Sequence, residues 1–235
     1  MNQYFPFSKE ISFPSGFVAT AEQVEKHIWP LLTPERQNKI KQVTSKRCFS
    51  TAIVMESIYD RGNISAVMRT GEGLGFANFH IVETFEKFKE ANRVTQGADK
   101  WVEVKKYKST SSCIEHLKSQ GYQICVTALA ADSVPISAVD FSKATALVLG
   151  NEKQGVSAEM IAAADKKIII PMPGFVQSFN ISVAGALAMY HILSDRIQKL
   201  GRNEDLGLDE IHILNMVYAL NTLDSAEDIL KARTK

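Results

Sequence analysis

The chain has 235 residues, a formal net charge of +1 and 45% hydrophobic residues, values that are ordinary for a soluble protein with one large core or two modest ones. No run approaches the roughly 18 uninterrupted apolar residues of a membrane-spanning helix. The first ten residues lack the basic and then apolar order of a secretory signal, so we expect a cytoplasmic protein with no membrane partner.

The charge is divided unevenly along the chain. Residues 203–235 carry a net charge of −4, and residues 1–202 carry +5. Basic residues also cluster, first at Arg36, Lys39, Lys41, Lys46 and Arg47, and later at Lys87, Lys89, Arg93, Lys100, Lys105, Lys106 and Lys108. Such clusters suit a polyanion such as RNA, and they equally suit helix faces that point into solvent.

The predicted elements alternate between helices and strands. Thr33, Pro34 and Glu35 form a favourable helix start, and we expect that helix to continue to about Lys46. Short apolar or β-branched runs predict strands at 51–56, 79–82, 123–129, 145–149 and 167–170, with helical patterns at 64–74, 111–119 and 157–164. This order predicts an α/β fold with a mostly parallel sheet covered by helices on both faces, whose function gathers at the carboxyl ends of the strands.

Neither the glycine-rich run after Thr70 nor the three cysteines indicates a ligand site. The run from Gly71 to Gly75 resembles a nucleotide-binding glycine loop, but it closes a helix and precedes a strand, so a glycine-rich helix end is the better interpretation. Cys48, Cys113 and Cys125 lie far apart and show no paired spacing, which indicates buried or idle thiols. We therefore expect no disulfide framework and no metal.

Three junctions between strands and loops carry polar residues that a core would not need. The first runs from Asn63 to Arg69, where Arg69 points away from the apolar face of the predicted helix. The second is the glycine-bounded loop around Glu152. The third spans 170–180, where two prolines and a glycine fix an irregular loop before a helix that Ser178 can cap. A surface arginine or a simple turn would explain the first two if each stood alone.

The C-terminal part of the chain is predicted to be helical. A helix from Ser178 to about Arg196 is apolar on nearly every side, so we expect it to be buried all round. A separate helix after Gly201 is expected to pack on the body or on a partner. The predicted organisation is an RNA-contacting helical extension at 1–48, a catalytic domain at 49–197 and an acidic helical extension at 198–235.

Together the three segments resemble a known family. Asn63 to Arg69, then Gly150-Asn151-Glu152, then IPMPGFVQSFNISVA at 170–184 resemble motifs 1, 2 and 3 of the SpoU branch of the SPOUT RNA methyltransferases, most closely the TrmH group of tRNA (guanosine-2′-O)-methyltransferases. The likeness covers about residues 35–196, and TQGADKW at 95–101 also matches a TrmH pattern. Phe179, Pro173 and the run after Thr70 depart from the usual family residues without removing a catalytic side chain.

The resemblance implies a deep trefoil knot that binds S-adenosylmethionine, and a homodimer that meets near the last helix of the knot. By position it implies that the methyl donor lies against Thr127, Gly150, Ile170, Met172 and Phe179. It also implies that Arg69 is catalytic, positioned with Asn63, Glu152, Ser178 and Asn180. Arginine is a poor base, so it either takes the hydroxyl proton in a desolvated pocket or stays charged while water accepts that proton.

The activity that the resemblance implies is S-adenosylmethionine-dependent 2′-O-methylation of RNA, with the D-loop guanosine at position 18 of tRNA as the expected target. An rRNA or a tRNA anticodon loop is the alternative substrate. A non-catalytic RNA-binding factor and a small-molecule methyltransferase are alternatives from other classes. The basic clusters speak against the small-molecule enzyme, and the retained set of Asn63, Arg69, Glu152, Ser178 and Asn180 speaks against the binding factor.

Overall fold

The protein is described from a computed structural model that covers residues 2–83 and 97–234. Its chain divides into two compact units. Unit 1 comprises Met1–Arg47 together with Glu204–Lys235, and unit 2 comprises Cys48–Asn203. The two segments that flank unit 2 in the sequence therefore fold with each other. Within the described residues, none of the helices has the length and apolar character needed to cross a membrane.

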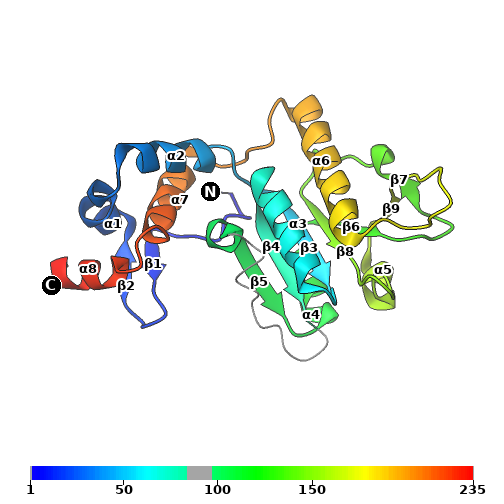
Figure 1. Cartoon of the computed structure of the whole chain (residues 1–235), viewed down its shortest axis with the longest axis horizontal. Helices are drawn as coiled ribbons and strands as arrows, with labels where there is room; N and C mark the ends of the chain where they lie inside the picture. Colours follow the sequence, from blue (N-terminus) through cyan, green and yellow to red (C-terminus); the bar gives the residue numbers. More distant parts are fainter. Residues whose placement is uncertain (1, 84–96, 235) are drawn as a thin grey trace. The chain divides into compact units, whose positions relative to one another are not determined.

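Unit 2 is built on a seven-stranded sheet with the order β5-β4-β3-β8-β6-β9-β7 (Figure 1). The strands are β3 (Cys48–Glu56), β4 (Phe76–Val82), β5 (Glu103–Tyr107), β6 (Gln123–Thr127), β7 (Val134–Pro135), β8 (Thr145–Leu149) and β9 (Lys166–Ile169). Every neighbouring pair in this sheet is parallel. The predicted α/β class with a mostly parallel sheet is confirmed.

The predicted strands are all present, and the bounds of the central ones differ little from the prediction. β8 has its predicted bounds, and β3 begins three residues earlier than predicted because Cys48 already donates its N–H to the Gly75 carbonyl at 2.9 Å. β5 was not predicted. It is an edge strand whose Lys105 and Lys106 are exposed, and lysines on an edge strand hinder pairing with another chain. This placement is a structural reason for part of the second basic cluster.

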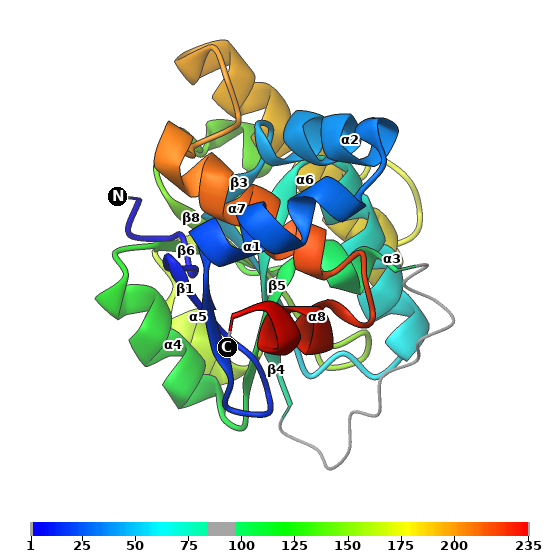
Figure 2. The same cartoon turned by 90° about the vertical axis from the view of Figure 1, so that its left-hand side faces the viewer.

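Two pairs of helices cover the sheet. α3 (Arg61–Gly73) packs against α6 (Ile181–Leu200), and α4 (Thr110–Ser119) packs against α5 (Ala158–Ala163). The two pairs lie on opposite sides of the sheet (Figures 1 and 2). Gly71 permits the close packing of α3, because a Cβ there would lie 2.6 Å from the Phe79 ring. Since α3 ends at Gly73 and Gly75 follows with φ of +89°, the glycine run does close a helix, as predicted.

α6 differs from its prediction in two ways. It begins at Ile181, and its N-cap is Asn180, whose side chain accepts from the Ser182 N–H; the prediction that Ser178 caps this helix was wrong. The helix also continues to Leu200 and is not buried all round. Val183, Leu187 and Tyr190 stay exposed along one stripe, and Ile197 and Leu200 continue it.

The three cysteines are free and buried, in agreement with the idle-thiol interpretation. Burial, with a smaller effect from nearby Glu56, raises the pKa of Cys113 to about 12, so this thiol stays uncharged at neutral pH.

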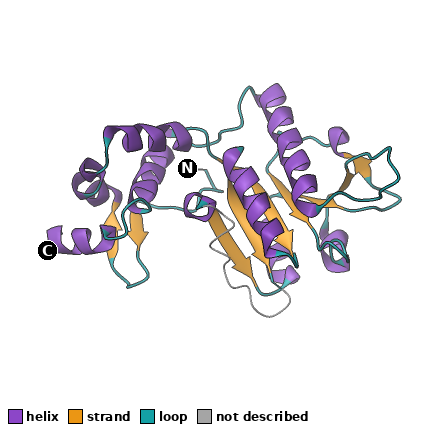
Figure 3. Ribbon diagram, in the orientation of Figure 1, coloured by secondary structure: helices purple, strands orange, loops and turns teal. Residues whose placement is uncertain are grey.

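Unit 1 is mostly helical (Figure 3). It contains the antiparallel hairpin of β1 (Glu10–Ser12) and β2 (Val18–Thr20), then α1 (Ala21–His27), a short 3₁₀ turn η1 (Trp29–Leu31), α2 (Pro34–Thr44), α7 (Leu208–Leu220) and α8 (Ala226–Arg233). α7 packs on α1 and α2, and the Thr44 hydroxyl donates to Asn215 Oδ1 at 2.7 Å. Unit 1 contains ten Lys or Arg and eleven Asp or Glu residues, so the acidic C-terminal segment offsets the basic N-terminal one within a single unit.

Candidate active site

One polar residue from each of the three predicted motifs lies in a shared group beside the carboxyl ends of β3 and β8. Asn63 lies in the first turns of α3, which follows β3, and Glu152 lies in the loop that follows β8. Asn63 Nδ2 donates to Glu152 Oε1 at 2.9 Å, and Asn180 Nδ2 donates to Asn63 Oδ1 at 3.3 Å. Because β3 and β8 are parallel neighbours, their outgoing loops must emerge together. Asn63, Glu152 and Asn180 therefore form one connected polar group.

Glu152 is an ionised acceptor that fixes this group. Partial burial opposes ionisation, but hydrogen bonds from the Asn63 side chain and from the Tyr59 and Asp60 N–H groups outweigh it and lower the pKa of Glu152 below its usual value. A carboxylate only accepts hydrogen bonds, so Asn63 must turn its amide nitrogen toward Glu152 and its oxygen toward Asn180. Glu152 thus sets the orientation of both amides.

The loops that carry these residues are tied to each other at their bases. Ser57 has φ of +52°, a conformation that non-glycine residues rarely adopt, and its carbonyl accepts from Asn151 Nδ2 at 2.7 Å. Glu56 is only 2% exposed, and its carboxylate accepts from the Thr110 hydroxyl at 2.7 Å and from the Ser157 N–H at 2.8 Å. Glu56 thereby joins the end of β3 to the first turns of α4 and α5.

Glu56 is a link between these elements that could not be identified from the sequence. The available signal was an acidic residue directly at the end of the apolar run that became β3. A carboxylate in that position needs buried donors, because an unpaired buried charge is costly. Its partners lie 54 and 101 residues further along the chain, so no local pattern could have named them.

A cavity of about 700 Å³ lies next to this polar group, and all five residues predicted to contact the methyl donor line it: Thr127, Gly150, Ile170, Met172 and Phe179. Glu152, Ser178 and Asn180 also line it. The Thr127 hydroxyl donates to the Val148 carbonyl at 3.0 Å, so it braces the neighbouring strand. The volume falls within the range of roughly 300–1,000 Å³ that is usual for small-molecule sites.

Glycine is required at position 150 by the path of the chain. A Cβ on Gly150 would lie 2.3 Å from both the carbonyl carbon of Gly155 and the nitrogen of Val156. The loop returns on itself there, with Asn151 and Gly155 paired through two backbone hydrogen bonds of 2.9 and 2.8 Å. The wall of the cavity is therefore made in part of backbone at this loop.

Two predicted site residues stand apart from the polar group. Arg69 is exposed on α3, about two turns beyond Asn63, and does not line the cavity. Ser178 lines the cavity but, among the residues that the structure describes, it forms no hydrogen bond. Within one chain, therefore, Asn180 is joined to Asn63, and no described interaction joins Ser178 or Asn180 to Arg69.

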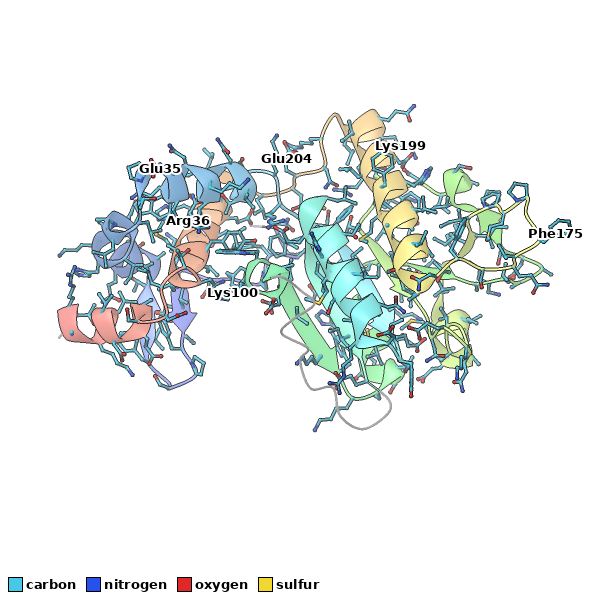
Figure 4. All side chains as sticks on the ribbon, in the orientation of Figure 1. Glu35, Arg36, Lys100, Phe175, Lys199 and Glu204 are labelled. Carbon is cyan, nitrogen blue, oxygen red and sulfur yellow. The ribbon has the colours of Figure 1, made fainter. Side chains whose placement is uncertain are left out.

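The predicted RNA-contacting residues have three different environments. Arg36, Lys39 and Lys41 are exposed on α2 (Arg36 is labelled in Figure 4), whereas Lys46 pairs with Glu204 at 2.8 Å. Arg47 is only 1% exposed and donates from Nε to the Tyr218 hydroxyl at 3.1 Å. The prediction that Arg47 contacts RNA is corrected, because α2 ends at Thr44 and the chain beyond it turns this side chain into the interior.

Part of the second basic cluster and of a matched pattern falls outside the described residues. Lys87, Lys89 and Arg93 are among the residues that the structure does not describe, and so is the start of the 95–101 pattern. In the described part of that pattern, Gly97 precedes a 3₁₀ turn at Ala98–Trp101.

Comparison with known proteins identifies the family. The model of the SpoU rRNA Methylase family matches residues 50–190. A tRNA (guanosine(18)-2′-O)-methyltransferase of Borreliella burgdorferi is 39% identical over 162 residues, which make up 69% of this chain and 74% of that protein. The protein of the same name in Aquifex aeolicus is 33% identical over 207 residues, covering 87% of this chain and 95% of that one.

Solved structures agree with this result. The crystal structure of the A. aeolicus TrmH/SpoU tRNA modifying enzyme matches with a TM-score of 0.74 and 33% identity, covering 80% of this chain and 97% of that chain. The matched family model spans the segments from which Asn63, Glu152 and Asn180 converge. From these findings we conclude that the chain belongs to the SpoU rRNA methylase family.

Proposed function

We propose that this protein transfers a methyl group from S-adenosylmethionine to the ribose 2′-hydroxyl of guanosine 18 in the D-loop of tRNA. The observation that carries the choice of tRNA is the extent of the likeness to the A. aeolicus tRNA enzyme. That likeness covers 87% of this chain, whereas unit 2 alone is 156 residues long, so part of unit 1 is shared as well. Substrate choice is expected to depend on such parts outside the catalytic unit.

The residues around the cavity fit the proposed methyl donor. Ile170, Met172 and Phe179 offer apolar and polarisable contacts suited to an adenine ring. The glycines of the Gly150 loop present backbone to the cavity. When bound, S-adenosylmethionine would supply an electrophilic methyl group on a sulfonium. Membership of the SpoU family also implies the trefoil knot, which we assign to the loops that follow β8 and β9.

The task of the chain is to hold the ribose hydroxyl in line with that methyl group at roughly 3 Å. Asn63 and Asn180 each use one amide hydrogen within the polar group, so the second amide hydrogen of each is available to a ribose or phosphate oxygen. The oxygens of Glu152 already accept three hydrogen bonds. We therefore assign Glu152 the role of orienting Asn63, and not that of a base.

Arg69 is proposed to remain a cation. Arginine side chains keep their proton in proteins, and their planar fork suits phosphate oxygens. Arg69 would bind the phosphate next to the reacting ribose and stabilise the negative charge that develops on the ribose 2′-oxygen. Water would take up the proton of the 2′-hydroxyl.

A second copy of the chain is proposed to complete the site, because Arg69 does not line the cavity of its own chain. The exposed stripe on α6 recurs at positions 183, 187, 190 and 197, a spacing that suits helix packing, and Tyr190 within it is 63% exposed. Exposed apolar stripes of this kind mark interfaces. We propose that a homodimer buries this stripe, and that Arg36, Lys39 and Lys41 contact the RNA. We also propose a cytoplasmic location.

The decisive experiment incubates the protein with labelled S-adenosylmethionine and total RNA and then maps every 2′-O-methyl group formed. We expect incorporation at guanosine 18 of tRNA. Methylation confined to rRNA or to an anticodon loop would show that the substrate is that RNA and not guanosine 18. Salt-sensitive RNA binding without any methyl transfer would favour a binding factor. Sedimentation of the natural chain and of a Tyr190→Glu variant tests the dimer, which the introduced charge should dissociate.

A further inference from the structure

Tyr59 is an exposed aromatic residue whose backbone is held by the polar group of the active site. Its N–H donates to Glu152 Oε2 at 3.0 Å, whereas the residue as a whole is 86% exposed. Single exposed apolar side chains are common on protein surfaces and need no explanation. Tyr59 differs from such residues because the same carboxylate that orients Asn63 also fixes the position of its backbone.

The loop that carries Tyr59 is anchored on both sides. Before it, the Ser57 N–H donates to the Val82 carbonyl at 2.9 Å, and the Ser57 carbonyl accepts from Asn151. After it, Asp60 caps α3 by accepting from the Gly62 N–H at 2.7 Å. Because the backbone of this loop is already held in place, a ligand that covers the ring costs mainly the rotamer freedom of one side chain.

A cation accompanies the ring on the side of the cavity. Lys153 Nζ lies 6.0 Å from the centroid of the Tyr59 ring, and Lys153 is one of the residues that line the cavity. RNA-binding sites combine these two features, since aromatic faces stack on unpaired bases and ammonium groups neutralise the phosphates beside them. Tyr59 lies in the loop that follows β3, and Lys153 lies in the loop that follows β8, next to Glu152. The Glu152 carboxylate joins the two loops by accepting from the Tyr59 N–H.

We propose that Tyr59 and Lys153 form a stacking site for an unpaired base of the RNA substrate, next to the ribose that is methylated. This inference rests on the proposed function and adds to it a base-binding site in the loop between β3 and α3. The Tyr59 ring would stack on the base, and Lys153 would bind the adjoining phosphate. The site contributes to RNA binding, and because Tyr59 does not line the cavity, its substitution leaves the binding of the methyl donor unchanged.

The test compares Tyr59→Ala, Tyr59→Phe and Lys153→Met in the full chain, with Leu208→Ala as a control of equal exposure in unit 1. KM for tRNA and kcat are measured with labelled S-adenosylmethionine, and the Kd of the methyl donor is measured separately. We expect Tyr59→Ala to raise KM for tRNA roughly 5- to 150-fold, the range that corresponds to a base–aromatic stack. Tyr59→Phe should stay within about twofold, and Lys153→Met should weaken binding and lower its salt dependence.

Three outcomes would overturn the stacking site. The first is an unchanged KM for Tyr59→Ala, and the second is an equal loss in Tyr59→Phe, which would point to the hydroxyl. The third is a weaker dimer in Tyr59→Ala by sedimentation, which would make the ring a subunit contact.

A failure of the proposed function is distinguishable from these outcomes, because the natural chain would then methylate no RNA. In that case, the fluorescence of Tyr59→Trp during titration with a single-stranded RNA oligonucleotide tests the stacking directly. Quenching beyond that of the natural chain supports the site, and its absence rejects it.

Discussion

Asn180 and Asn63 lie 117 positions apart in the sequence, yet their side chains meet at 3.3 Å. Asn180 has two roles in this contact. Its Oδ1 caps α6 by accepting from the Ser182 N–H at 2.8 Å, and its Nδ2 donates to Asn63. The start of α6 is thereby fixed directly to the polar group that contains Glu152.

The two roles of Asn180 can be separated by substitution. Serine is also a good N-cap but is too short to reach Asn63, so Asn180→Ser should keep the stability of unit 2 within about 0.5 kcal/mol. Turnover should fall about tenfold or more, because Asn63 loses its partner. Asn180→Ala should lose the same activity and also about 1 kcal/mol of stability. Urea unfolding and methyl-transfer rates measure the two effects, and full activity in Asn180→Ser would refute the positioning role.

Glu152→Gln tests whether a carboxylate is needed to orient Asn63. Three N–H donors point at the Glu152 oxygens, and the amide nitrogen of glutamine would face at least one of them. An unsatisfied donor of this kind costs about 1–3 kcal/mol, so we expect kcat to fall roughly 5- to 150-fold. The Kd of the methyl donor should change much less.

Glu159→Gln is the matched control for Glu152→Gln, because Glu159 is exposed on α5 and lies outside the cavity. It should behave as the natural chain does. Equal activity in both variants would mean that the charge of Glu152 has no part in positioning.

The convergence of Asn63 and Glu152 was predictable because both residues follow buried strands, and strand order brings parallel carboxyl ends together. Other features had no local signal. The interior position of Arg47 depends on α2 ending at Thr44 and on Tyr218, which lies 171 residues away. The exposed stripe on α6 looks like a core pattern in the sequence, because its residues are of the types that also fill protein interiors.

Gly150→Ala should disrupt the cavity without changing any charged residue. The added methyl group would lie 2.3 Å from backbone atoms of Gly155 and Val156, which have no rotamer to move into. We expect a loss of about 1–3 kcal/mol of stability and at least a tenfold weaker Kd for the methyl donor, measured by calorimetry. Gly174→Ala is the control, since a Cβ there meets no atom within 4 Å. If both variants bind equally well, the Gly150 loop does not form the wall of the binding site.

The buried side chain of His80 should make the stability of unit 2 depend on pH. Burial first, and then the nearby His116 and Lys105, lower the pKa of His80 to about 3. Its Nε2 lies 3.0 Å from Asn78 Oδ1, which can only accept, so this nitrogen carries the hydrogen, and Nδ1 accepts from the Tyr107 hydroxyl at 2.9 Å. The folded protein therefore holds His80 as the neutral imidazole.

An unfolded histidine has a pKa of about 6.5, so below that pH the unfolded chain binds one proton more than the folded chain at this position. The contribution of the neutral His80 to the free energy of unfolding is complete above about pH 6.5. It is lost as the pH falls toward 3, by up to about 1.4 kcal/mol per pH unit. His80→Gln can keep both hydrogen bonds without titrating. We would introduce His80→Gln into a Trp29→Phe background, so that Trp101 fluorescence reports on unit 2, and measure urea unfolding at pH 7 and pH 5. The free energy of unfolding should change between these two pH values by about 2 kcal/mol less in His80→Gln than in the background protein. Equal pH effects in the two proteins would mean that His80 becomes protonated without unfolding.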